Sequence, residues 1–152
     1  MGKLETKNLR EDLDAAAKLR DQILAIKPKE PTDSAISIKP LIGTWVNCDP
    51  NTRSIVRIEF GEKSGSLTVH VFGKCHPTPC DWGVVPGIPY AESVVANEVV
   101  AFSAFYDHGF SEKIVTGHFD VGTLVVEIFT KFKDNSGRSN YYLRVYLCKR
   151  EE

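Results

Sequence analysis

The sequence has no long apolar run and no apolar segment near its N-terminus. Residues 1–9 alternate charged side chains with isolated leucines, whereas a secretory signal needs a continuous apolar region of roughly 7–15 residues. No segment approaches the roughly 20 consecutive apolar residues that a membrane-spanning helix requires. These absences predict a soluble, cytoplasmic protein with no membrane span.

An excess of charge of one sign is also lacking. The chain has 19 Lys and Arg residues against 20 Asp and Glu, a net charge of -1, and no basic cluster. A nucleic-acid-binding surface needs such a cluster, so the charge pattern argues against a DNA or RNA partner. The 152 residues, 42% of them hydrophobic, are enough for one globular domain with its own core.

Motifs of common catalytic sites are absent as well. The chain contains no Gly-x-Ser-x-Gly, P-loop or dinucleotide-binding sequence. Residues Gly61 to Gly65 resemble a hairpin turn rather than a phosphate-binding loop. His70 and His118 fall on the polar faces of expected strands, where a solvated histidine is the simpler interpretation. The sequence therefore favours a protein that is not an enzyme, and it identifies no cofactor.

Residues 8–27 predict an amphipathic helix. Its apolar residues recur at steps of three and four, the spacing of one helical face. Asn8 and Glu11 match a capping box, and Pro28 ends the pattern. Residues 28–40 are rich in proline, serine and charge and predict a linker. Residues 1–40 are thus expected to be an extension, and residues 41–152 the main domain.

From Leu41 onward the apolar pattern changes to a period of two, which is typical of strands separated by turns. The expected strands are 41–48, 54–60, 66–73, 87–95, 98–106, 111–119, 123–132 and 140–149. Pro86 and Pro89 make the fourth of them irregular or edge-like. The predicted fold is all-β: an eight-stranded antiparallel up-and-down β-barrel with an N-terminal amphipathic helix.

The register of the hairpins can be predicted because apolar side chains must share one face. The pairs expected on this basis are Trp45 with Val56, Phe60 with Leu67, Tyr106 with Ser111, and Phe119 with Leu124. One apolar face then continues through all the strands, and such a sheet is expected to close on itself.

Two short segments are similar to calycin barrels. Residues 41–47, LIGTWVN, resemble the Gly-x-Trp opening that lipocalins, fatty-acid-binding proteins and avidins share. Residues 143–146, LRVY, resemble the final strand of fatty-acid-binding proteins. The resemblance implies a basic residue packed over Trp45 and a ligand that enters at the loop end. The predicted register places Arg144 and Tyr146 outside the barrel, unlike that family, and the chain lacks the several tryptophans of avidins.

In an up-and-down barrel alternate loops meet at one end, here residues 48–53, 74–86, 107–110 and 133–139. This end is rich in polar and aromatic side chains suited to binding a small hydrophobic or amphipathic ligand. The predicted ligand-binding residues are Asn47, Cys75, His76, Trp82, Tyr106, Asp107 and His108.

The segment from Lys74 to Gly83 allows three interpretations. Cys75, His76 and Cys80, with Cys48 or His108, form a candidate zinc-ligand set, although the spacing differs from that of known zinc knuckles. Alternatively, the segment is a proline-stiffened loop whose cysteines are buried or joined in a disulfide. In the third interpretation it is a lid in which Trp82 stacks on a ligand.

Cys148 is expected near Leu41, at the opposite end of the barrel from Cys48. These two cysteines should then lie too far apart for a disulfide. Without an export signal, the cysteines are expected to be thiols.

Two functions remain open. The first is a small-molecule-binding barrel. The alternative is a protein-interaction or structural module with a filled core, whose helix at residues 8–27 binds a partner, associates with a second copy, or packs on its own barrel. The barrel centre distinguishes them, because no room remains for a ligand if the following residues meet there: Phe60, Val69, Phe102, Val126 and Val145.

Overall fold

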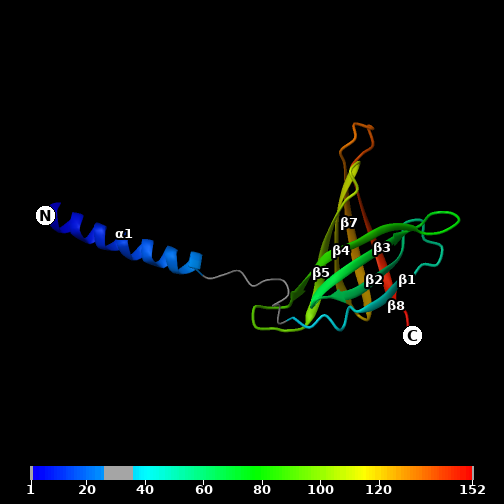
Figure 1. Cartoon of the computed structure of the whole chain (residues 1–152), viewed down its shortest axis with the longest axis horizontal. Coiled ribbons are helices and arrows are strands. Elements are labelled where there is room, and N and C mark those ends of the chain that lie inside the picture. Colours follow the sequence, from blue (N-terminus) through cyan, green and yellow to red (C-terminus); the bar gives the residue numbers. More distant parts are fainter. Residues whose placement is uncertain (1, 26–35, 152) are drawn as a thin grey trace. The chain divides into compact units, whose positions relative to one another are not determined.

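The computed structural model describes residues 2–25 and 36–151, and the chain divides into two compact units, Met1–Glu30 and Pro31–Glu152 (Figure 1). The first unit contains helix α1 (Gly2–Ala25). Asn8 lies inside this helix, so the predicted capping box is wrong; the preceding Lys, Leu and Glu residues favour helix and extend it. Residues 26 and 27, the expected helix end, lie outside the described residues. No helix of the described part has the length and apolarity needed to cross a membrane.

The second unit is a closed antiparallel barrel in which every strand pairs with its neighbours in sequence and β8 pairs with β1. This confirms the predicted eight-stranded, all-β fold. The strands are β1 (Gly43–Asn47), β2 (Ile55–Lys63), β3 (Ser66–Gly73), β4 (Cys80–Ala91), β5 (Val99–Asp107), β6 (Ser111–Asp120), β7 (Thr123–Phe132) and β8 (Tyr141–Lys149).

One of the four expected hairpin pairs is present, and three are shifted. Phe119 pairs with Leu124 as expected, because Val121 and Gly122 form a two-residue turn with positive φ at both positions. The other pairs are shifted: Trp45 pairs with Ile58, Phe60 with Val69, and Tyr106 with Lys113. Each shift is of two residues and keeps the apolar face, so the apolar pattern cannot distinguish the two registers.

Strand β4 begins at Cys80, not at residue 87, and it is a full barrel strand rather than an edge. Cys80 pairs with Gly73 on β3, while Pro86 and Pro89 pair with residues on opposite neighbours. The β4–β5 ladder is irregular next to Pro89, between Tyr90 and Ala91, and the β3–β4 ladder is irregular between the partners of His70 and Phe72. The early start places Trp82 on a strand instead of in a loop.

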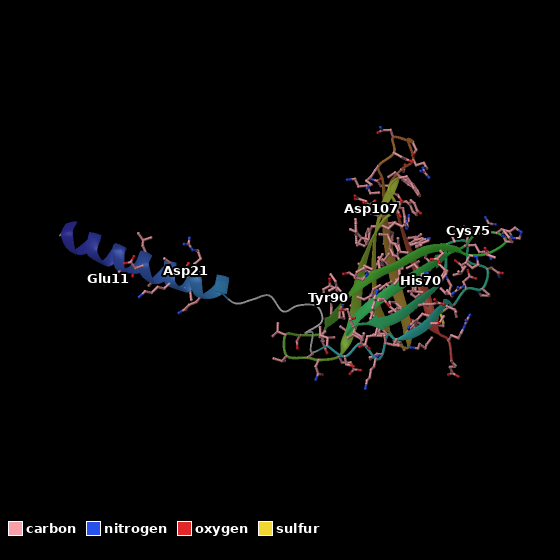
Figure 2. All side chains as sticks on the ribbon, viewed as in Figure 1. Glu11, Asp21, His70, Cys75, Tyr90 and Asp107 are labelled. Carbon is pink, nitrogen blue, oxygen red and sulfur yellow. A yellow bond between two sulfur atoms is a disulfide. The ribbon has the colours of Figure 1, made fainter. Side chains whose placement is uncertain are left out.

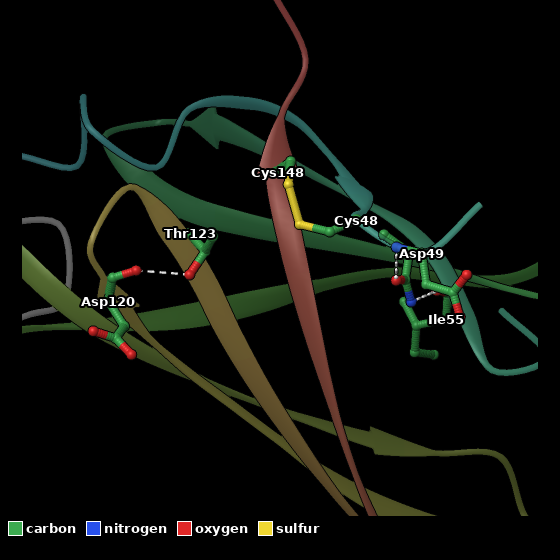
Figure 3. Close-up of a disulfide and its surroundings, with 7 residues drawn as sticks. Cys48, Asp49, Ile55, Asp120, Thr123 and Cys148 are labelled. Carbon is green, nitrogen blue, oxygen red and sulfur yellow. Dashed lines mark hydrogen bonds between the residues drawn. A yellow bond between two sulfur atoms is a disulfide. The ribbon is translucent and has the colours of Figure 1, made fainter. Parts of the chain in front are cut away.

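A disulfide joins Cys48 to Cys148 at the seam between β1 and β8, with the two Cα atoms 5.4 Å apart (Figure 3). The prediction that these residues cannot bridge is therefore wrong. Val46 pairs with Cys148, and the Cys48 N–H donates to the carbonyl of Tyr146 at 2.9 Å. No turn fixes the register between the first and last strands, so this offset could not be predicted from residue spacing. Cys75 and Cys80 form a second disulfide, so the expected thiols are replaced by two cross-links.

Residues 36–42, which include part of the segment expected to be a linker, pack against the barrel. Ile38 and Leu41 are buried in the core. The carbonyl of Leu41 accepts a 2.8 Å hydrogen bond from the Trp45 indole. Ser37 forms an isolated bridge with Glu98. Ile36 and Ile38 alternate with the polar Ser37 and Lys39, which explains why one side of this segment packs on the barrel.

The centre of the barrel is filled by side chains. The rings of Phe60 and Phe102 meet edge to face with centroids 4.9 Å apart. Phe102 also pairs with Gly117, where an added Cβ atom would lie 2.4 Å from the Phe102 ring. Val126 and Val145 continue the same row and belong to the same buried cluster. By the criterion stated above, this layer leaves no room for a ligand.

The calycin-like features are present in part. The Lys149 ammonium lies 5.1 Å from the Trp45 ring centroid and donates to the carbonyl of Ile42. The basic residue over the opening tryptophan is thus Lys149, whereas the resemblance was drawn on residues 143–146, whose Arg144 lies near the Tyr146 ring instead. Arg144 and Tyr146 face outward, as the register argument predicted. The architecture is consistent with a calycin-like barrel.

Candidate functional site

One row of inward-facing side chains lies at the loop end of the barrel, above the filled centre. Tyr106 pairs with Lys113, Lys113 with Thr130, and Thr130 with Tyr141, so one residue from each of β5 to β8 contributes. Because paired residues share a face, these four side chains form a continuous layer. We call this layer, together with Trp82 and His108, the mouth cluster.

Three of the predicted ligand-binding residues meet in the mouth cluster. The ring centroids of Trp82 and Tyr106 are 5.6 Å apart, and those of Tyr106 and His108 are 5.4 Å apart. The Nε2 atom of His108 lies 3.3 Å from the carbonyl oxygen of Trp82. Trp82 and His108 are partly exposed, whereas Tyr106 is buried. The structure thus brings aromatic residues of β4 and β5 to one place.

The Tyr106 hydroxyl connects three strands. The hydroxyl can donate its proton to the Gly83 carbonyl, at 2.8 Å, or to the Val69 carbonyl, at 3.2 Å. Its oxygen accepts a 3.2 Å hydrogen bond from the Val71 N–H. Burial raises the pKa of Tyr106 to about 12. This hydroxyl therefore stays protonated and holds β3 and β4 against β5.

Lys113 is the main residue that the sequence analysis missed. Its side chain points into the barrel and is only 7% exposed. Its ammonium donates to the Thr130 hydroxyl at 3.1 Å and lies 5.2 Å from the Trp82 ring centroid and 5.7 Å from that of Tyr141. Burial, and then the positive charge of Arg138, lower the pKa of Lys113. Within residues 36–151 no carboxylate forms an ion pair with it.

Ser111 supplies a second unusual polar group. It lies one inward position before Lys113 on β6 and is fully buried. Its hydroxyl has no hydrogen-bond partner among the described residues. A buried donor without a partner costs about 1–3 kcal/mol, so such groups are uncommon away from functional sites. The signal for both residues was the alternation Ser111, Lys113, Val115, which placed a lysine on the apolar face.

Arg138 adds positive charge beside the mouth cluster. Its guanidinium lies 4.1 Å from the Phe132 ring centroid and 5.6 Å from that of Phe110. It also donates to an Asp134 carboxylate oxygen at 2.7 Å. Hydrogen bonds from Ser136 and then from Arg138 lower the pKa of Asp134. The β7–β8 loop therefore presents an ordered cation over aromatic rings.

The remaining predicted residues do not join the mouth cluster. Asn47 donates to the Ile55 carbonyl at 2.8 Å, a contact that holds the loop after β1. Asp107 receives a 2.9 Å bond from Lys133, which lowers the pKa of Asp107. Cys75 and His76 belong to the β3–β4 loop, away from Asp107 at the tip of the β5–β6 hairpin (Figure 2).

A metal site in the β3–β4 loop has no support from these contacts. Cys75 and Cys80 are joined in a disulfide, one of the alternatives left open above, and are not thiolate ligands in this state. Residues 36–151 and the described side chains of α1 contain no group of three His, Cys, Asp or Glu residues placed to hold a metal ion. On the outer face His70 is paired rather than simply solvated, because its Nε2 lies 2.6 Å from an Asp81 carboxylate oxygen.

A second surface feature was also missed. Phe105, Ile114, Phe129 and Tyr142 face outward and pair with one another across β5 to β8. We call these four residues the outer row. They line a mainly apolar groove of about 400 Å³ on the outer wall of the barrel. Phe105, Ile114 and Phe129 alternate with inward-facing residues along their strands, so the period-two pattern was the signal for this row.

The mouth cluster and the outer row are therefore the two features to which a function can be attached. No protein-family model, curated protein or solved structure matches the chain significantly.

Proposed function

We propose that this chain is a non-catalytic, calycin-like binding protein that takes a small planar organic anion at the mouth cluster. The observation that carries the proposal is Lys113, a buried ammonium without a carboxylate partner among the described residues. Lysine is seldom buried unless it is paired, since removing an isolated charge from water is costly. An anionic ligand would offset that cost.

The surroundings of Lys113 favour a flat ligand. Trp82 and Tyr141 place ring faces near the ammonium, and Tyr141 is 46% exposed. Planar aromatic molecules pack well against such rings, and a carboxylate at one end would accept hydrogen bonds from Lys113 and Ser111. Arg138 increases the attraction for an anion. The ligand would lie above the layer of Phe60 and Phe102, not in the barrel centre.

Binding of 2-naphthoate measured by calorimetry tests this proposal. Lys113→Met should weaken binding roughly ten- to hundredfold, the loss expected for a hydrogen bond to a charged group. Lys63→Met, which removes an exposed lysine at the end of β2, is the matched control and should leave affinity unchanged. Equal affinity in the two variants, or no binding by the natural chain, would contradict the proposal.

A second proposal is a protein-interaction module, and the filled barrel centre favours it. The outer row then serves as the contact surface. The helix remains an alternative contact, for a partner or a second copy, because Leu13 and Leu19 are exposed. The oligomeric state of the chain and of its Ile114 and Leu13 variants distinguishes these surfaces.

A further inference from the structure

The outer row is an apolar stripe between two rows of polar and charged side chains on the outer wall. Its four members are about half exposed: Phe105 52%, Ile114 50%, Phe129 45% and Tyr142 50%. Adjacent strands lie about 4.8 Å apart, so the row is a contiguous surface about 14 Å long. Contiguous apolar surface of this kind marks interaction sites more often than chance exposure.

The rows on both sides of this stripe carry charge in an ordered pattern. On the loop side Glu112 of β6 pairs with Lys131 of β7 and with Asp107 of β5. Lys133 of the same chain lies within ion-pair distance of both carboxylates, so Lys131 remains available to a second copy. On the other side Thr116 of β6 pairs with Glu127 of β7, and Arg144 of β8 continues that row. The apolar stripe therefore has flanking residues whose charges differ between β6 and β7.

This pattern is complementary to itself. A two-fold axis parallel to the strands and between β6 and β7 would place β6 of one copy over β7 of a second copy. Ile114 would then pack on Phe129 of the second copy, and Glu112 would face Lys131 of the second copy. Symmetry makes each of these contacts twice. Thr116 would face Glu127, so no like charges meet across β6 and β7.

We propose that the outer face of β5 to β8 is a homodimer interface, in which the outer row of one copy packs on that of a second copy about this axis. The partner is a second copy of this chain because the two-fold rotation brings the charges that flank the outer row opposite complementary charges of the same surface. The interface goes beyond the proposed ligand function, since the outer row and the inward-facing Lys113 lie on opposite faces of the sheet.

The oligomeric state of the full chain, measured by sedimentation equilibrium up to about 100 μM, tests the proposal. The natural chain should be a dimer and Ile114→Glu a monomer, because a charge would be buried at the centre of the interface. Val94→Glu, at a fully exposed residue of the β4–β5 loop, is the matched control and should remain dimeric. A monomeric natural chain would overturn the proposal. So would a dimer that Leu13→Glu dissociates and Ile114→Glu does not.

A charge exchange tests the axis itself without introducing charge into the apolar stripe. Glu112→Lys should weaken the dimer at least tenfold, because two lysines would face each other twice. Adding Lys131→Glu to it should restore most of the affinity. If the double variant is as weak as Glu112→Lys alone, the proposed arrangement is wrong. Circular dichroism of each variant reports whether the barrel is folded.

Discussion

The seam between β1 and β8 should depend strongly on the Cys48–Cys148 disulfide. Three residue pairs join these strands, whereas ten join β6 and β7. The cross-link connects residues 100 positions apart in the sequence. Replacing both cysteines with serine removes the bond and leaves two small polar side chains at positions that are largely exposed or half-buried. The loss should therefore come mainly from the unfolded state.

The expected size follows from the entropy of loop closure. A cross-link that closes a loop of about 100 residues lowers the entropy of the unfolded chain and so raises its free energy by about 4.7 kcal/mol at 25 °C. For a loop of about 5 residues the same relation gives about 2 kcal/mol. Cys75 and Cys80 are separated by 5 positions and form the matched short-loop control. The Cys48/Cys148 double variant should lose more than twice as much free energy of unfolding as the Cys75/Cys80 double variant.

Urea unfolding of the natural chain and of both double-serine variants measures these losses. The long-loop variant should show a lower midpoint and a larger m-value, because its unfolded state expands and exposes more surface. Equal losses in the two variants would refute the loop-entropy reasoning. A loss below about 1 kcal/mol for Cys48/Cys148 would show that the seam does not depend on the cross-link.

Three further changes have defined outcomes. Tyr106→Phe should destabilise the barrel by about 1–3 kcal/mol in urea unfolding, since the Gly83 carbonyl and other buried partners lose their hydrogen bonds. Gly117→Ala should cost about 1–3 kcal/mol, because its Cβ atom would meet the Phe102 ring at 2.4 Å. Lys113→Met should raise the melting temperature at pH 7. Burial lowers the pKa of Lys113 below 10.5 in the folded state. At pH values between the folded-state pKa and 10.5, the unfolded chain binds more protons than the folded chain, so the stability of the natural chain should rise with pH. Calorimetry at pH 7 and pH 10 should find a smaller rise in the Lys113→Met variant.

The period-two pattern predicted the barrel because each strand buries one face, and this constraint acts on every residue from Leu41 onward. It could not predict register beyond a multiple of two residues. The ambiguity was removed where the turn itself was located correctly, at Val121–Gly122, and the Phe119–Leu124 pair was correct there. Ser64 and Gly65 form a two-residue turn of the same kind, but Gly61 to Gly65 was taken as the turn, so the predicted β2–β3 register was shifted. The offset between β1 and β8 depends on the whole closed sheet, and for that reason the Cys48–Cys148 bond was missed.

The candidate site was partly predicted for a related reason. Trp82, Tyr106 and His108 were expected at the loop end, and they meet there. Asn47 and Cys75 were expected on the assumption that all four loops converge, which depends on the tilt of the strands and cannot be obtained from spacing. Lys113 was missed because a charged residue was assumed to face solvent, although its position in the alternation was inward.

The Cys48–Cys148 bond also makes most of the barrel a covalent ring. Residues 48 to 148 include seven of the eight strands in full or nearly in full, so a single backbone cut in any loop between them leaves both products attached. A protease that opens the β7–β8 loop would convert the ring into a linear chain with new ends at the mouth, without releasing a fragment. Separating the pieces would then require both reduction of this disulfide and unfolding of the barrel, because β8 stays paired with β7 and β1.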